Sequence, residues 1–255
     1  MFKTNTFFRA IVFALSTVAV SAVAAEETAY PLDVFPDESK QETDTGTGAQ
    51  LTYLTTNPAS DTNLYFHERS WSSDSTFIIF YSAREPGGLM GYIVATGELF
   101  RIATPSGAVG AATAAKNKSA VFALRGNEVV ELNVTIALAK NPKRKRSSVK
   151  VSERVICTLP ESSGTTALNE NSDGTKLAVG RPGTAGSDLP IVFVIDQQTG
   201  EMKEGYRVPT PPQFMWHVQW SQTSPNLLSF AGSYPRLNVV DVDTGKAFGP
   251  YDQLR

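Results

Sequence analysis

Cysteine and histidine are the scarcest chemistry-bearing residues of this sequence. Among its 255 residues there is one cysteine, Cys157, and there are two histidines, His67 and His217. A single cysteine excludes an internal disulfide and a cysteine-rich zinc site. Two histidines also exclude a metal site that needs three histidines from one chain.

An excess of charge and long apolar runs are missing as well. The formal net charge is -2, which gives no reason to expect a nucleic-acid-binding surface. Beyond the first 25 residues no segment is apolar enough to span a membrane, so no membrane association is predicted for the mature protein.

The N-terminus has the three parts of a secretory signal peptide. Lys3 and Arg9 precede an apolar run at residues 10–20, and small residues follow at positions 21–25. The apolar run is shorter than the ~20 residues that a membrane-spanning helix needs. This pattern predicts a cleaved signal peptide over residues 1–25 and therefore export, to the periplasm of a Gram-negative organism or to the outside.

The mature chain divides into a lead-in and one larger domain. Residues 26–48 are acidic, rich in threonine and aperiodic, which predicts a flexible lead-in. From residue 49 to 255, short runs of Val, Ile, Leu, Phe and Tyr alternate with Gly, Pro, Asn and Asp. That alternation, with almost no helical periodicity, predicts an all-β domain.

Two sequence elements repeat along this domain. The first is a polar turn followed by an apolar strand, and the second is a strand that ends in a Thr-Gly turn. Copies of the first lie at residues 71–80, 116–124, 171–179 and 220–230, and copies of the second at residues 92–97, 194–200 and 239–245. Repeats of roughly 40–50 residues are typical of WD40-like β-propeller blades. A β-sandwich with chance spacing is the alternative.

The number of repeats predicts about four blades, the lower end of the range for closed propellers. The sequence stops just after a Thr-Gly hairpin, where a further strand is expected. We therefore expect the blades to be part of a larger ring, and the chain to be part of a longer protein.

Several motifs of this domain occur together in one known family. They are Asn63–Phe66 leading into Trp71–Asp74, and Trp216–Ser221 followed by Ser224–Phe230. Over residues 50–245 the sequence thereby resembles the oligogalacturonate lyases of pectin breakdown. The resemblance implies a seven-bladed propeller and β-elimination on short acidic oligogalacturonides. TolB-like and WD40-like propellers share much of the turn-strand pattern, so a non-catalytic scaffold that binds a protein or carbohydrate partner is the alternative.

The chemistry of such an elimination sets requirements on the site. The proton beside the uronic acid carboxylate must be removed, and it is weakly acidic until a cation or an Arg or Lys neutralises the carboxylate. Histidine suits the role of base at neutral pH. His217 matches the catalytic histidine of the family and is the predicted base, with a structural loop histidine as the alternative.

Other candidate residues have weaker signals. Arg84 and Arg181 lie in glycine-rich loops and are candidates to bind a substrate carboxylate, and Trp216 is a candidate to stack on sugar rings. Solvated arginines and blade packing are the alternatives. His67 is predicted to have a structural or surface role. The basic run at residues 143–146 could attract polyanionic pectin fragments, but an exposed loop between strands is the favoured interpretation.

The resemblance also implies a Mn²⁺ cofactor held by several histidines and a glutamine. No histidine follows His217, and residues 230–235 stand where the family has a His-Glu-Gly-Pro motif. An arginine of the family is likewise replaced within residues 189–191. The metal ligands are therefore unknown from this sequence, and the Mn²⁺ site is expected to lie outside it.

Overall fold

The structure is a computed structural model that describes residues 29–160, 166, 168–181, 183, 189–209, 215–232 and 236–250. The predicted signal peptide lies outside these residues. Every regular element within them is a β-strand, which confirms the predicted all-β fold. The described part of the chain contains no helix long and apolar enough to cross a membrane.

Four antiparallel sheets, called blades 1 to 4 here, form the body of the molecule, and each contains four strands that follow one another in the chain. Blade 1 consists of β5 (Asp61–Asn63), β6 (Phe77–Ser82), β7 (Gly88–Ile93) and β8 (Leu99–Ile102). Blade 2 consists of β9 (Gly110–Ala114), β10 (Ala120–Arg125), β11 (Glu128–Ala137) and β12 (Ser148–Thr158). Blade 3 consists of β13 (Asn169–Glu170), β14 (Lys176–Arg181), β15 (Ile191–Asp196) and β16 (Met202–Arg207). Blade 4 consists of β17 (Trp216–Trp220), β18 (Leu227–Ala231), β19 (Leu237–Asp241) and β20 (Lys246–Phe248).

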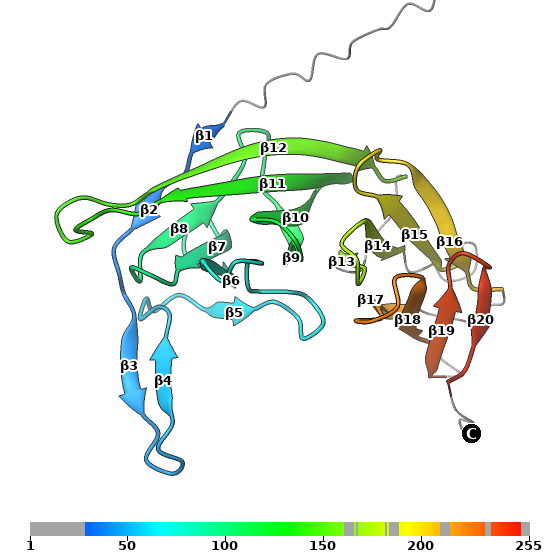
Figure 1. Cartoon of the computed structure of the whole chain (residues 1–255), viewed down its shortest axis with the longest axis horizontal. Helices are drawn as coiled ribbons and strands as arrows, with labels where there is room; N and C mark the ends of the chain where they lie inside the picture. The colour runs from blue at the N-terminus through cyan, green and yellow to red at the C-terminus, as the bar shows by residue number, and fades with distance from the viewer. Residues whose placement is uncertain are drawn as a thin grey trace, which may run out of the picture.

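The first strand of each blade lies toward a common centre. In Figure 1 the strands β5, β9, β13 and β17 surround this centre, whereas β12, β16 and β20 lie on the outside. This radial order is that of propeller blades, in which the innermost strands line a central channel.

The segment before blade 1 differs from its prediction as a flexible lead-in. β1 (Tyr30–Pro31) pairs with the outer edge of β12, and β2 (Val34–Phe35) pairs with the outer edge of β8. β3 (Lys40–Thr43) and β4 (Gln50–Tyr53) form a separate hairpin. The polar, acidic sequence of this segment does not reveal these strands. They form because the free backbone groups of an outer blade edge can pair with almost any extended segment.

The predicted Thr-Gly turns are present and have a clear local cause. Gly97, Gly200 and Gly245 have φ values of 74°, 72° and 69°, in the left-handed region that favours glycine. Before two of these glycines an aspartate side chain closes the turn, since Asp196 and Asp241 each accept two backbone N–H bonds from the residues that follow. These turns depend only on neighbouring residues, which is why the sequence predicts them.

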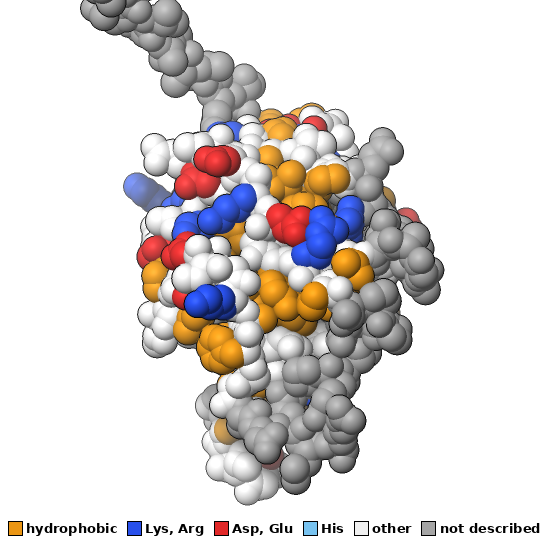
Figure 2. Space-filling view, turned by 90° about the vertical axis from the view of Figure 1, so that its right-hand side faces the viewer, with side chains coloured by type: hydrophobic (Ala, Val, Ile, Leu, Met, Phe, Trp, Pro, Cys, Tyr) orange, Lys and Arg blue, Asp and Glu red, His pale blue; other side chains and the backbone are white. Residues whose placement is uncertain are grey.

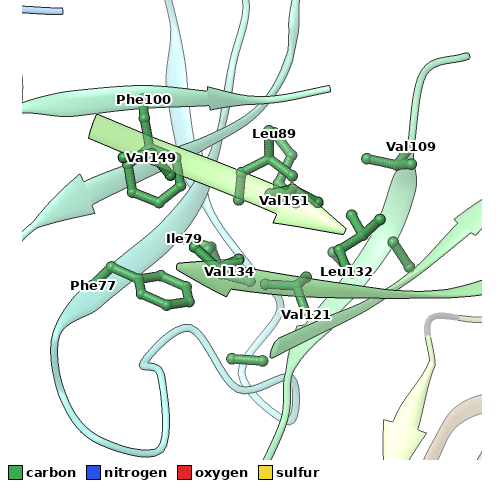
Figure 3. Close-up of a cluster of buried hydrophobic side chains, with 14 of the residues drawn as sticks. Phe77, Ile79, Leu89, Phe100, Val109, Val121, Leu132, Val134, Val149 and Val151 are labelled. Atoms are coloured by element: carbon green, nitrogen blue, oxygen red, sulfur yellow. The ribbon is translucent and has the colours of Figure 1, made fainter. Parts of the chain in front are cut away.

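The hydrophobic core consists of layers between adjacent blades. In the layer between blades 1 and 2, Phe77 and Phe100 of blade 1 face Leu132 and Val149 of blade 2 (Figure 3). Similar clusters join blades 2 and 3 and blades 3 and 4. Each blade therefore buries one or both of its faces on a neighbour, and the strand register decides which side chains enter the core.

Candidate functional site

A loop of blade 1 occupies the centre of the blade assembly. β5 ends at Asn63, and pairing with β6 resumes only at the isolated bridge between Trp71 and Ile78. The intervening residues 64–70, called the hub loop here, leave the sheet and run toward β13 and β17 (Figure 1). An interruption of an inner strand thus brings side chains of blade 1 to the centre.

Hydrogen bonds to blade 2 hold the end of the hub loop. The Arg69 N–H donates to Thr113 Oγ1 at 3.0 Å, and the Ala114 N–H donates to the Arg69 carbonyl at 2.8 Å. Thr113 and Ala114 both belong to β9, the inner strand of blade 2.

The buried side chain of Asn169 joins the hub loop to blades 3 and 4. Its Nδ2 donates to the backbone carbonyl of His67 at 2.8 Å, and its Oδ1 accepts the backbone N–H of Trp220 at 2.7 Å. Asn169 begins β13 and Trp220 ends β17. One amide side chain therefore connects three blades at the centre, and the indole of Trp220 is buried between blades 3 and 4.

The two histidines of the chain meet in this place. The ring centroids of His67 and His217 are 5.9 Å apart, with the rings nearly perpendicular. Tyr65 stacks on His217 at 5.2 Å, with an angle of 10° between the planes. Phe66 lies 5.0 Å from the His67 ring and 6.2 Å from the His217 ring. We call Tyr65, Phe66, His67 and His217 the hub cluster.

A β-bulge places His217 in the hub cluster. β17 pairs with β18 at Trp216 and again at Gln219, with a register shift between them. His217 lies in this shift with φ 54°, a left-handed conformation that is uncommon for residues other than glycine. The bulge changes the direction of the imidazole relative to a regular strand.

The surroundings of the cluster favour neutral side chains. The pKa of His67 is lowered, first by burial and then by the charge of His217, so the neutral imidazole is favoured. Its Nδ1 is buried, and no group in the described part of the chain hydrogen-bonds to it. Burial raises the pKa of the neighbouring Glu68 carboxyl, although the Tyr65 N–H donates to that carboxylate at 3.1 Å.

The aromatic side chains of the site are open to solvent. Tyr65 is 48% exposed, Phe66 is 74% exposed and Trp216, which precedes His217 at the start of β17, is 49% exposed. Two predicted site residues, His217 and Trp216, thus lie at the centre of the blades. His67, predicted to have a structural or surface role, lies there too.

The two predicted arginines have other contacts. Arg84 makes a bidentate ion pair with Glu38 at 3.1 and 2.8 Å, and its Nη2 also donates to Thr55 at 3.1 Å. The guanidinium of Arg181 lies 5.8 Å from the ring centre of Phe193. In the described part of the chain, no hydrogen bond or ring contact joins either arginine to the two histidines.

Sequence reasoning missed the roles of Tyr65, Phe66 and Asn169. An aromatic pair directly before a histidine, in a segment that interrupts a strand, was the available signal for the first two. Asn169 had no local signal, because its partners lie 102 and 51 residues away in the chain.

The described residues do not fit the Mn²⁺ site that the resemblance implies. Among them there is no group of three or more His, Cys, Asp or Glu side chains that could hold a metal ion. The hub cluster supplies two imidazoles, fewer than the several histidines of the site that the resemblance implies.

Comparisons with known proteins support the fold. No family model and no curated protein matches the chain. Among solved structures, oligogalacturonate lyase from Vibrio parahaemolyticus is similar with a TM-score of 0.67 and 15% identity, over 86% of this chain and 61% of that one. An oligogalacturonate lyase in complex with manganese has a TM-score of 0.62 and 16% identity, over 88% of this chain and 61% of that one. A TolB-type structure from Agrobacterium tumefaciens has a TM-score of 0.52 and 10% identity, over 89% of this chain and 71% of that one.

These similarities confirm that the fold is that of a β-propeller. The chain spans about 61% of the length of both lyase structures. At such low identity the likeness concerns the fold, and the particular family and activity are matters of proposal.

Proposed function

We propose that this protein is an exported β-propeller that binds acidic oligosaccharides of the oligogalacturonide type at the hub cluster. The observation that carries the proposal is the combination of three exposed aromatic side chains with two imidazoles at the centre of the blades. Sugar rings have apolar C–H faces that pack on aromatic rings, while their hydroxyl and carboxylate groups need polar partners.

Residues of the hub cluster and their neighbours Trp216 and Asn169 each have a suitable role in such binding. Tyr65 and Trp216 present amphipathic aromatic surfaces, each about half exposed, on which a pyranose ring can stack. The imidazole of His217 can donate hydrogen bonds to a carboxylate, and more strongly when it is protonated. Asn169 holds the hub loop against blades 3 and 4, so the aromatic surface is preorganised.

Catalysis by β-elimination is the second candidate, and His217 is the residue that supports it. A neutral imidazole is a suitable base, and His217 lies on an inner strand beside a histidine whose neutral form is favoured. The described residues provide no metal cluster, and neither of the two predicted arginines contacts a histidine of the hub cluster to neutralise a substrate carboxylate there. We therefore propose binding, rather than cleavage by these residues alone, as the function of this chain.

Calorimetric titration of the purified protein with trigalacturonate tests the proposal. Tyr65→Ala removes one stacking surface and should weaken binding about three- to ten-fold, because one aromatic stacking contact contributes about 0.5–1.5 kcal/mol. Phe248→Ala is the matched control, because Phe248 is an equally exposed aromatic on the outer strand β20. No binding of trigalacturonate by folded protein, or an equal effect of both variants, would contradict the proposal.

A parallel assay separates binding from cleavage. Ultraviolet absorbance reports unsaturated products formed from oligogalacturonate, with and without added Mn²⁺. We expect no product from the protein alone. Product formation that is lost in His217→Ala would establish the second candidate instead.

A further inference from the structure

The strongest concentration of charge lies far from the hub cluster, at the end of the longest hairpin. β11 and β12 are connected by residues 138–147, called the hairpin tip here. Between positions 138 and 150 there are six basic residues and no acidic residue, in a chain whose net charge is -2. The basic residues are Lys140, Lys143, Arg144, Lys145, Arg146 and Lys150.

These cations are exposed, and within the described residues their charges are not paired at close range. In the described part of the chain none of the six forms an ion pair, and Arg146 donates instead to the carbonyl of Pro142 at 3.0 Å. Several basic side chains elsewhere in the described part of the chain form ion pairs. Arg207 pairs with Glu204 at 2.5 Å, and on the side shown in Figure 2 basic and acidic side chains lie next to one another.

A buried carboxylate anchors the base of the hairpin tip. Glu98, in the turn between β7 and β8, is 0% exposed and accepts bonds from the backbone N–H of Ser147, at 3.1 Å, and from the Ser147 hydroxyl. The same hydroxyl accepts the N–H of Ala139 at 3.0 Å, across the base of the tip. Hydrogen bonds to a buried charged group are among the stronger ones, so the hairpin is fastened to blade 1.

Strand pairing holds the hairpin further. β11 and β12 remain paired out to Ala137 and Ser148, and β1 and Leu32 bond to the outer edge of β12. In Figure 1 the hairpin extends past blade 1, and its tip lies at the opposite end of the molecule from blades 3 and 4. The tip is thus a second surface, separate from the hub cluster and held in a defined position.

We propose that the hairpin tip is a docking site for a linear anionic polysaccharide of uronic acid residues. Exposed cations on an anchored hairpin create a positive potential that attracts a polyanion and concentrates it near the protein. A lipid surface suits the tip less well, because Leu138 is its only large apolar side chain. The tip also has no aromatic residue on which nucleic acid bases would stack.

The choice of a uronic acid polymer rests on the proposed function, since the hub cluster would take short pieces of the same polymer. The tip would hold the long chain by charge, while the hub would bind individual sugar rings by stacking. Because the two surfaces use different residues, their contributions can be separated by mutation.

The test compares two variants with the same change in net charge. Lys143→Gln/Lys145→Gln removes two cations from the tip, and Lys203→Gln/Lys246→Gln removes two exposed lysines from β16 and β20. Affinity for polygalacturonate is measured at a series of NaCl concentrations. At low salt the tip variant should bind about three- to ten-fold more weakly than the control variant, and the difference should shrink as salt screens the charges.

Three outcomes decide the matter. An equal loss in both variants would overturn the proposal, because net charge alone would then explain the binding. Tip-dependent binding to vesicles of phosphatidylglycerol and phosphatidylcholine that exceeds binding to polygalacturonate would overturn it in favour of a lipid surface. Polymer binding that needs the tip lysines but is unchanged in Tyr65→Ala supports it, even where trigalacturonate fails to bind the hub cluster.

Discussion

Asn169 is the residue on which the geometry of the hub cluster most depends, and its replacement by alanine tests the description of the site. The change removes two hydrogen bonds, the one that the Asn169 amide donates to the His67 carbonyl and the one that it accepts from the backbone N–H of Trp220. Trp220 is 2% exposed, so its N–H would lose its partner without gaining water. The His67 carbonyl lies in a half-buried loop and can be rehydrated in part.

The expected magnitude follows from these two bonds. A buried polar group left without a partner costs about 1–3 kcal/mol, and a hydrogen bond that water can replace costs about 0.5–1.5 kcal/mol. Asn169→Ala should therefore lower the free energy of unfolding by about 2–4 kcal/mol. For a chain of this size that corresponds to a fall in Tm of about 4–16 °C.

Urea unfolding followed by circular dichroism measures this change. Asn127→Ala is the matched control, because Asn127 is exposed and, among the residues that the structure describes, only its backbone carbonyl makes a hydrogen bond. In Asn169→Asp the new carboxylate can still accept the backbone N–H of Trp220, but it is repelled by the carbonyl oxygen of His67. Protonation turns it into a donor to that carbonyl, so this variant should regain stability relative to wild type as pH falls. If Asn169→Ala and Asn127→Ala differ by less than about 0.5 kcal/mol, the role assigned to Asn169 is refuted.

Three further predictions concern other parts of the fold. Because the pKa of His67 is lowered in the folded protein, the stability tied to its neutral form is present above pH 6.5 and is lost as pH falls below that value. Tm measured across this range should fall less in His67→Gln than in wild type. Gly91→Ala should lower the free energy of unfolding by about 1–3 kcal/mol, because the new methyl group would overlap the buried ring of Phe100. Gly110→Ala is the control in the same urea assay and should be nearly neutral, because the space around its new methyl group is open. Arg84→Ala removes the ion-pair partner of the partly buried Glu38 carboxylate, which keeps a hydrogen bond from Thr55. This variant should lower the free energy of unfolding by about 1–3 kcal/mol, with trigalacturonate affinity unchanged in calorimetry.

The strands and turns of the four blades could be predicted from local sequence. Short apolar runs after polar turns, at residues 77–80 and 227–230, specify strands. Thr-Gly at residues 96–97 and 244–245 specifies hairpin turns. These features depend on residues that are neighbours in the chain, so composition and spacing are sufficient to find them.

The segment before blade 1 could not be predicted in the same way. Its residues were expected to be flexible because they are polar and aperiodic, yet β1 and β2 are ordered by pairing with the edges of β12 and β8. The same segment supplies Glu38, the partner of Arg84. An arginine that was predicted to bind substrate thus has an ion pair with a residue 46 positions earlier.

The candidate site was predictable only in part. His217 and Trp216 could be singled out from their motif, because the repeat positions the start of an inner strand near the centre. The partners of His217 could not, because His67 and Tyr65 reach it through a loop that interrupts a different blade.

The sequence by itself thus determined the all-β class, the blade repeat, the hairpin turns and the concentration of basic residues at 143–146. Tertiary structure alone decided which histidine meets which aromatic ring, which arginine is paired and how the basic tip is anchored to Glu98. The physical reason is the range of the interactions. Strand and turn preferences arise between residues a few positions apart, whereas the hub cluster and the anchors depend on contacts that exist only after the blades have packed together.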